Sequence, residues 1–138
     1  MTELGGKHDS DYDSIFTARA MIAMGAKANN VIPIDTVHIR VHDLEDLERN
    51  LIIGRDLGFE GMLVLNPKEL PLVHQYYTPS EEEVVWANEM LQLSEEAVAL
   101  GKGVAVKDNK FIGPPMVKMA KDIIKKAELI STRNNIIL

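Results

Sequence analysis

Apolar residues recur at two alternating spacings along the first half of the chain. Residues 15–28 carry apolar side chains at helical spacing, whereas residues 31–39 and 62–65 are short apolar runs with little polar alternation. Such runs are typical of strands that are buried on both faces of a parallel sheet. Between them, residues 43–57 begin with acidic side chains and end at Gly58, which predicts a helix. The alternating order predicts an α/β fold with two parallel strands.

The second half begins with the strongest helix signal in the sequence. The stretch 78–81 (TPSE) predicts a capping box with Pro79 at the first helical position, and a long helix follows to Gly101. Residues 104–107 and 110–112 flank Asp-Asn, a pair that favours a tight hairpin turn. This region therefore predicts a helix followed by a β-hairpin.

A last helix is expected from Met116 to about Ile130, after a Gly-Pro-Pro start and before a polar tail. We therefore expect two parts in the chain. Residues 1–77 should form strand–helix steps, and residues 78–138 should form a helix–hairpin–helix extension.

Composition narrows the class of protein. The chain has 138 residues, a net charge of -6 and no cysteine. The acidic balance argues against a nucleic-acid surface, and the lack of cysteine excludes disulfides and thiolate zinc sites. No apolar run is long enough to span a bilayer. We expect a cytoplasmic protein without nucleic-acid or membrane partners.

Candidate site residues follow the two predicted strands. Asp35 lies near the end of the first, and Asn66-Pro67 ends the second. Ligands of α/β folds bind at the carboxyl ends of strands, so Asp35, Asn66 and Pro67 are candidates to face a substrate. Asp35 could orient substrate or a metal-bound water, or simply bond a loop amide. Asn66 could contact an acyl group or coenzyme A, or only start a turn.

Two histidines and two aspartates raise the question of a metal site. His38, His42, Asp43 and Asp46 have the spacing of helical metal ligands, but they fall on a predicted strand end and loop. We therefore expect no dedicated metal site there.

Two parallel strands cannot form a stable fold alone, because their edges and faces would stay uncovered. A complete (β/α)8 barrel takes about 250 residues. We therefore expect either self-association or a partner that supplies further barrel strands.

Several motifs occur in an order that resembles a known family. They are Ala18-Arg19, Ile34-Asp35-Thr36-Val37, Asp43-Leu44-Glu45-Asp46-Leu47, Leu57-Gly58-Phe59-Glu60-Gly61, Asn66-Pro67, Thr78-Pro79-Ser80-Glu81-Glu82-Glu83, Gly103-Val104 and Phe111-Ile112-Gly113-Pro114-Pro115. Their order resembles the carboxyl-terminal part of the HpcH/HpaI aldolase and citrate lyase β-subunit family, in particular its citryl-CoA and malyl-CoA lyase-like branch. The resemblance extends over residues 16–129.

The resemblance implies the closing part of a TIM barrel followed by a lid-like extension. It also implies magnesium-dependent cleavage or formation of a 3-hydroxyacyl-CoA thioester such as malyl-CoA or citryl-CoA, with acyl-CoA and 2-oxo acids as ligands. In the family, the substrate-binding arginine and two metal-binding carboxylates come from earlier strands, so we expect no magnesium ligands in this chain. The aspartates at positions 9, 11 and 13 could include the tail of the metal-binding segment or form a solvated helix start.

The chain also departs from the family pattern at two positions. Asn66 stands where the family often has histidine, and an amide cannot shuttle a proton. Gly113 stands where lyases of the family often carry an acid or base that serves a neighbouring subunit. We therefore expect a lyase that is active only when the other barrel strands are supplied. The alternative is a non-catalytic remnant or an oligomerisation or interaction module of the family.

Overall fold

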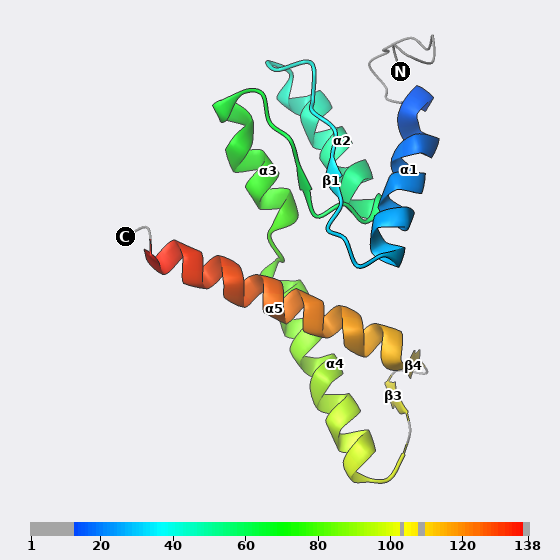
Figure 1. Cartoon of the computed structure of the whole chain (residues 1–138). Helices are drawn as coiled ribbons and strands as arrows, with labels where there is room; N and C mark the ends of the chain where they lie inside the picture. The colour runs from blue at the N-terminus through cyan, green and yellow to red at the C-terminus, as the bar shows by residue number, and fades with distance from the viewer. Residues whose placement is uncertain (1–12, 103, 108–109, 137–138) are drawn as a thin grey trace. The chain divides into compact units, whose positions relative to one another are not determined.

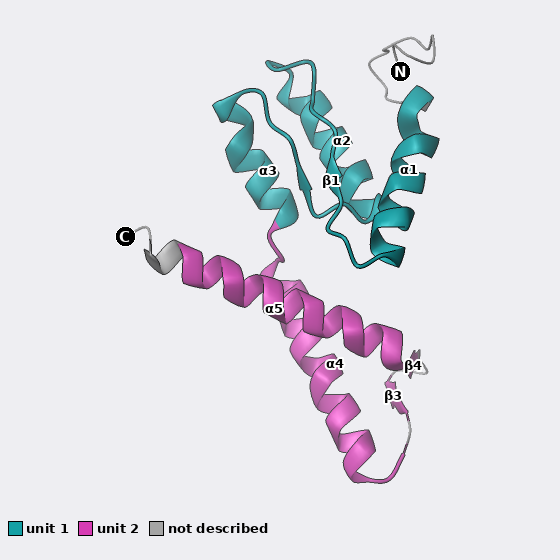
Figure 2. Cartoon of the chain, in the orientation of Figure 1, with its two compact units in different colours: residues 1–77 teal, residues 78–138 magenta. Residues whose placement is uncertain are grey.

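The computed structural model describes residues 13–102, 104–107 and 110–136. The chain divides into two compact units, which are residues 1–77 (unit 1) and 78–138 (unit 2) and are coloured separately in Figure 2. The fold is mixed α/β and mostly helical. Among the described helices, none has the length and apolar character needed to cross a membrane.

Unit 1 alternates helices with two short strands, as Figure 1 shows. Its elements are α1 (Asp13–Ala28), β1 (Ile34–Asp35), α2 (Leu44–Leu57), β2 (Gly61–Met62), the 3-10 helix η2 (Pro67–Glu69) and α3 (Leu70–Tyr77). The strands pair in parallel, with Ile34 opposite Gly61 and Asp35 opposite Met62. The predicted parallel pairing is therefore present.

The strands are shorter than the apolar runs predicted. After β1, the Asp35 side chain accepts the N–H of Thr36 at 2.8 Å, which removes that donor from the ladder. After β2, the N–H groups of Leu65 and Asn66 lie 3.3 Å from Oε2 of Glu69. Side chains thus bind the backbone groups that would extend both strands.

Helix α2 begins and ends as its sequence predicts. The Asp43 side chain accepts the N–H of Asp46 at 3.0 Å, which caps the first turn. Gly58 ends the helix in the left-handed conformation with φ 95°. The buried face of α2 contributes Leu47 and Leu51 to the core of unit 1.

Unit 2 consists of two long helices and a hairpin. Its elements are α4 (Glu81–Ala99), β3 (Ala105–Lys107), β4 (Lys110–Ile112) and α5 (Pro114–Ile136). Strands β3 and β4 pair antiparallel. Buried alanines allow α4 and α5 to pack closely around Met90; they are Ala87, Ala97 and Ala120.

Two helix boundaries of unit 2 differ from those predicted. The N-cap of α4 is Ser80, whose hydroxyl accepts the N–H of Glu83, so Pro79 precedes the cap instead of starting the helix. Helix α5 starts two residues before Met116 and continues past Ile130 to Ile136. The polar tail is helical because its residues remain compatible with helix; Thr132, for example, donates to the Glu128 carbonyl at 2.9 Å.

Candidate functional site

The loops that follow β1 and β2 meet at the carboxyl ends of the strands. The N–H of Leu63 donates to the Asp35 carbonyl at 3.2 Å. Farther along, Nδ2 of Asn66 donates to the Val41 carbonyl at 3.0 Å. The structure therefore brings the loops that carry the candidate residues together at the strand ends, where α/β enzymes place their sites.

Asp35 lies inside unit 1 and forms an ion pair with Arg19 of α1. Nε of Arg19 is 3.1 Å from Oδ1 of Asp35, and Nη2 is 2.5 Å from Oδ2. Nη2 also lies 3.3 Å from the carbonyl of Asn50 on α2. The carboxylate of Asp35 is therefore held by a cation as well as by the loop amide of Thr36. Asp35 lies in the interior of unit 1, with a side chain only 1% exposed.

The ion pair was not predicted, although the sequence carries a signal for it. Arg19 falls four residues after Ile15 and four before Ala23, on the apolar stripe of the predicted helix. A charged residue within such a stripe requires a buried partner. Asp35 is that partner.

Gly54 allows α2 to approach the ion pair closely. A Cβ at this position would lie 2.5 Å from Oδ2 of Asp35 and 3.0 Å from Oη of Tyr77. Burial, together with the negative charge of Asp35, raises the pKa of Tyr77 to about 12. The phenol of Tyr77 therefore stays protonated beside the ion pair at neutral pH.

His38 lies between two carboxylates in the interior of unit 1. Its Nδ1 is 3.1 Å from Oε1 of Glu69, and its Nε2 is 3.0 Å from Oδ2 of Asp46. Burial tends to raise the pKa of Asp46, but hydrogen bonds from Arg49 and His38 outweigh it and lower that pKa below its usual value. Sequence reasoning grouped His38 with Asp46 but missed Glu69, which comes from the turn after β2.

Asn66 is both a turn starter and a link between loops. Its Oδ1 accepts the N–H of Lys68 at 3.1 Å, while Glu69 reaches back to the N–H of Asn66. These two bonds form a capping box around Pro67, whose side chain is exposed at the start of η2. The amide of Asn66 therefore anchors the loop after β2 to the loop after β1.

A magnesium site does not fit the described residues. No three His, Asp or Glu side chains among them converge to hold a metal ion. The buried carboxylates of Asp35, Asp46 and Glu69 are bound by cationic side chains, by His38 or by backbone N–H groups. His42 is exposed, and Asp43 caps α2. The aspartates at positions 9 and 11 lie outside the described residues.

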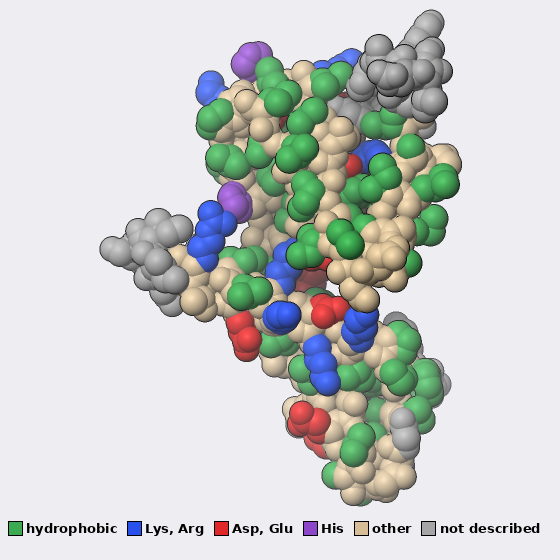
Figure 3. All heavy atoms as spheres, viewed as in Figure 1, with side chains coloured by type: hydrophobic (Ala, Val, Ile, Leu, Met, Phe, Trp, Pro, Cys, Tyr) green, Lys and Arg blue, Asp and Glu red, His purple; other side chains and the backbone are tan. Residues whose placement is uncertain are grey.

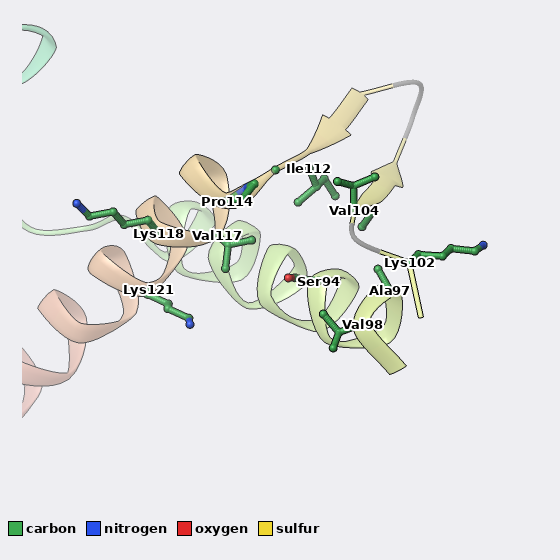
Figure 4. A pocket seen from close by; sticks show the side chains of 12 residues that line it. Ser94, Ala97, Val98, Lys102, Val104, Ile112, Pro114, Val117, Lys118 and Lys121 are labelled. Carbon is green, nitrogen blue, oxygen red and sulfur yellow. The ribbon is translucent and has the colours of Figure 1, made fainter. Parts of the chain in front are cut away.

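A hollow lies in unit 2 between α4, α5 and the hairpin (Figure 4). It measures about 490 Å³ and includes Gly113 in its lining. Lysines 102, 118 and 121 also belong to the lining, but Figure 4 shows their ammonium groups far apart and pointing away from the apolar side chains. No carboxylate or imidazole lines this hollow among the described residues.

Comparison with known proteins identifies the class of enzyme to which the chain is related. Residues 1–67 match the model of the HpcH/HpaI aldolase/citrate lyase family. The chain is 31% identical over 130 residues to the mitochondrial citramalyl-CoA lyase of Rattus norvegicus, an alignment that covers 94% of the chain and 38% of that protein. It is 30% identical over 129 residues to the (3S)-malyl-CoA thioesterase of Cereibacter sphaeroides, which covers 94% of the chain and 45% of that protein.

Solved structures agree with this relationship. The protein CitE of Mycobacterium tuberculosis, in complex with magnesium, acetoacetate and coenzyme A, matches with a TM-score of 0.73 and 25% identity, over 91% of this chain and 47% of that one. A citrate lyase of Burkholderia xenovorans matches with a TM-score of 0.71 and 16% identity, over 88% and 37%. The chain spans less than half the length of these relatives. The resemblance predicted from the motifs is therefore confirmed, because the HpcH/HpaI aldolase/citrate lyase family model matches residues 1–67 and the named relatives align along most of the chain.

Proposed function

We propose that the chain forms the closing strand–helix steps of a TIM-barrel CoA-thioester lyase, followed by a helix–hairpin–helix extension. The observation that carries this proposal is the family match over residues 1–67, which contain the parallel strand pair. The proposed reaction is cleavage or formation of a 3-hydroxyacyl-CoA thioester of the malyl-CoA or citryl-CoA type. The named activities of the curated relatives support this class of substrate.

The surface around the strand pair supports a barrel with further strands. Four apolar side chains on and beside β1 and β2 are about half exposed or more; they are Ile32, Ile34, Leu63 and Leu65. Figure 3 shows hydrophobic side chains spread over the visible face of unit 1. Parallel strands are normally covered on both faces, so this face fits additional barrel strands.

The reaction needs a proton to leave the substrate hydroxyl as the carbon–carbon bond breaks. The bonding electrons pass into the enolate of the acyl thioester, which then takes up a proton. Asn66 can donate or accept a hydrogen bond but cannot carry this proton, and Gly113 has no side chain. The chain's proposed role is therefore to bind and orient substrate through Asn66 and Pro67 at the strand end, while Asp35 holds α1 against β1.

Magnesium enters the proposal only by relationship, since CitE was solved with magnesium and coenzyme A. When bound, the ion would polarise an oxygen of the substrate acid. Because the described residues do not fit a magnesium site, its ligands would come from outside the described ranges or from barrel strands that this chain does not contain.

The test is release of acetyl-CoA from malyl-CoA or citryl-CoA, with magnesium or with EDTA. The chain should be assayed alone and together with a separately produced amino-terminal half of the C. sphaeroides relative. We expect turnover only in the mixture with magnesium. Asn66→Ala should reduce this turnover by about tenfold through loss of a positioning hydrogen bond. Asn88→Ala, at an exposed position of α4, should leave the turnover unchanged. Absence of turnover from a folded mixture would overturn the proposal.

The second candidate function is a non-catalytic oligomerisation module of the same family. It is favoured by the two positions that lack a proton-carrying group, Asn66 and Gly113, and by the lack of a metal-binding cluster among the described residues. Sedimentation of the purified chain tests it. A stable homo-oligomer without turnover supports the module, and a monomer excludes it.

A further inference from the structure

His38 is buried at the strand ends and has a carboxylate at each ring nitrogen. Its side chain is 1% exposed, as buried as those of its partners Asp46 on α2 and Glu69 on η2. Both contacts are hydrogen bonds only if both ring nitrogens carry protons or if one of the carboxyl groups is protonated. The number of protons on the His38 ring and on the two carboxyl groups therefore decides how firmly this cluster holds together.

Charge balance favours two ring protons. Oε2 of Glu69 already faces two backbone N–H groups, and Oδ1 of Asp46 accepts from Arg49 at 2.9 Å. Both carboxylates thus have donors suited to their ionised forms. If the His38 ring is an imidazolium, its charge and that of Arg49 match the two carboxylates of Asp46 and Glu69 in this largely buried cluster. A neutral ring would leave one excess negative charge.

The remaining charged neighbours do not replace His38. Arg40, in the loop that follows β1, acts on Asp46 through its charge, but its guanidinium lies 3.9 Å from the carboxylate of Asp43 at the surface. Asp43 itself accepts the backbone N–H of Asp46. His38 is therefore the group that connects Asp46 to Glu69.

We propose that His38 is a positioning residue whose doubly protonated ring ties α2 to η2 and thereby fixes Asn66 at the end of β2. The link runs from His38 to Glu69 and from Glu69 to the backbone N–H groups of Leu65 and Asn66. A ring nitrogen without its proton would place a lone pair against a carboxylate, and that contact would be repulsive. The two ring protons therefore hold the strand-end loop in place.

This inference rests on the proposed function only where it assigns Asn66 to the substrate. The positioning itself concerns the chain alone. Its test therefore needs no turnover and can be read by nuclear magnetic resonance of the unmodified chain labelled with nitrogen-15.

At neutral pH, we expect both ring nitrogens of His38 to be protonated and their protons to exchange slowly with water. The exposed rings of His42 and His74 should exchange rapidly and serve as internal references. The amides of Leu65 and Asn66, which donate to Glu69, should also exchange slowly. One unprotonated ring nitrogen in the folded chain, or rapid exchange at these two amides, would overturn the proposal.

Variants separate positioning from general stability. His38→Gln should speed hydrogen exchange at the amides of Leu65 and Asn66 by roughly tenfold or more, the size expected when a hydrogen bond to a charged group is lost. Glu69→Gln should leave the His38 ring with a single proton. His42→Gln, in the same loop but exposed, should change neither readout.

If the two test variants fail to fold, the ring and amide signals of the unmodified chain still decide. Slowly exchanging ring and amide protons without turnover in the lyase assay would count against the proposed function alone. Turnover without these slowly exchanging protons would count against the role of His38 alone.

Discussion

The two units differ in what fills their interiors. Among the described residues, every buried charged or amide side chain belongs to unit 1: Arg19, Asp35, His38, Asp46, Asn50 and Glu69. The buried side chains of unit 2 are those of alanines, Met90 and Ile112. Buried ion pairs are an inefficient source of stability, because desolvation offsets their attraction. Their concentration at the strand ends of unit 1 therefore indicates that side chains and loops must be held in a fixed geometry there. The interior of unit 2 shows no such requirement.

The largest effect should follow from breaking the buried ion pair. Asp35→Ala leaves the guanidinium of Arg19 buried without its carboxylate, and we expect a loss of about 3–5 kcal/mol in the free energy of unfolding of unit 1. Hydrogen exchange read by mass spectrometry should show the loss in peptides from α2. The control is Glu60→Ala, which removes the partially exposed pair with Lys27 and should cost about 1 kcal/mol or less. Equal losses for the two variants would show that the buried ion pair matters no more for stability than the partially exposed one.

The apolar interior of unit 2 should respond to a change in volume instead of charge. Met90→Ala leaves a cavity between α4 and α5, and we expect a loss of about 2–4 kcal/mol in unit 2. The fluorescence of Trp86, the single tryptophan of the chain, reports this unit during urea unfolding. Val98→Ala on the exposed side of α4 should shift the transition by at most about 0.5 kcal/mol.

A single methyl group tests how tightly the ion pair is enclosed. Gly54→Ala places a Cβ against Asp35 and Tyr77, and we expect a loss of about 1–3 kcal/mol. The same substitution at Gly25 of α1, where an added Cβ would meet no other part of the structure within 4 Å, should stabilise the fold by about 0.5–1 kcal/mol. Thermal unfolding should therefore move in opposite directions, and stabilisation by both substitutions would show that the enclosure is loose.

A smaller effect should identify the cap of α4. Ser80→Ala removes the hydroxyl that accepts the N–H of Glu83, and a loss of about 1 kcal/mol is expected in unit 2. Thr78→Ala should be close to neutral, because the structure places this residue before the cap. The reverse result would restore the boundary that the sequence suggested.

The ionisation of Tyr77 should change stability only at alkaline pH, so this effect is the smallest of those expected at neutral pH. Its folded pKa of about 12 lies above the ordinary value of 10.0, so its contribution to stability is complete below pH 10.0 and lost as the pH rises towards 12. Ultraviolet titration should show a step near pH 12. Tyr77→Phe should abolish this step, and Tyr76→Phe should leave it, although the hydrogen bond to Glu48 also raises the pKa of Tyr76. A step near pH 12 that survives Tyr77→Phe would refute the assignment.

The sequence predicted the order of the elements of unit 1 better than their lengths. Asp43 and Gly58 set the ends of α2 through local bonds that can be read from the chain. The strand lengths depend on side chains that reach back to the backbone, from Asp35 to Thr36 and from Glu69 to Leu65. An apolar run carries no sign of such competition.

Helix boundaries in unit 2 show a similar limit. Thr78 and Ser80 are each followed three residues later by glutamate, so both offer a capping box. Preferences for single residues do not choose between them, and the structure selects the second.

The strand-end positions of Asp35 and Asn66 could be predicted from the sequence, but the contacts of these residues could not. Asp35 and Asn66 were placed at strand ends by position alone. Their partners Arg19 and Val41 lie 16 and 25 residues away, and Glu69 lies 31 residues from His38. Contacts over such separations depend on how helices cover the strands, which a single sequence does not specify.

Gly113 constrains how an acidic side chain could be introduced at this position. A side chain at this position would collide with the ring of Phe111, which is largely exposed and can turn away. Replacing glycine with aspartate in one step thus requires the aromatic ring to move, whereas the opposite replacement meets no obstacle. A directed-evolution library should therefore vary positions 111 and 113 together.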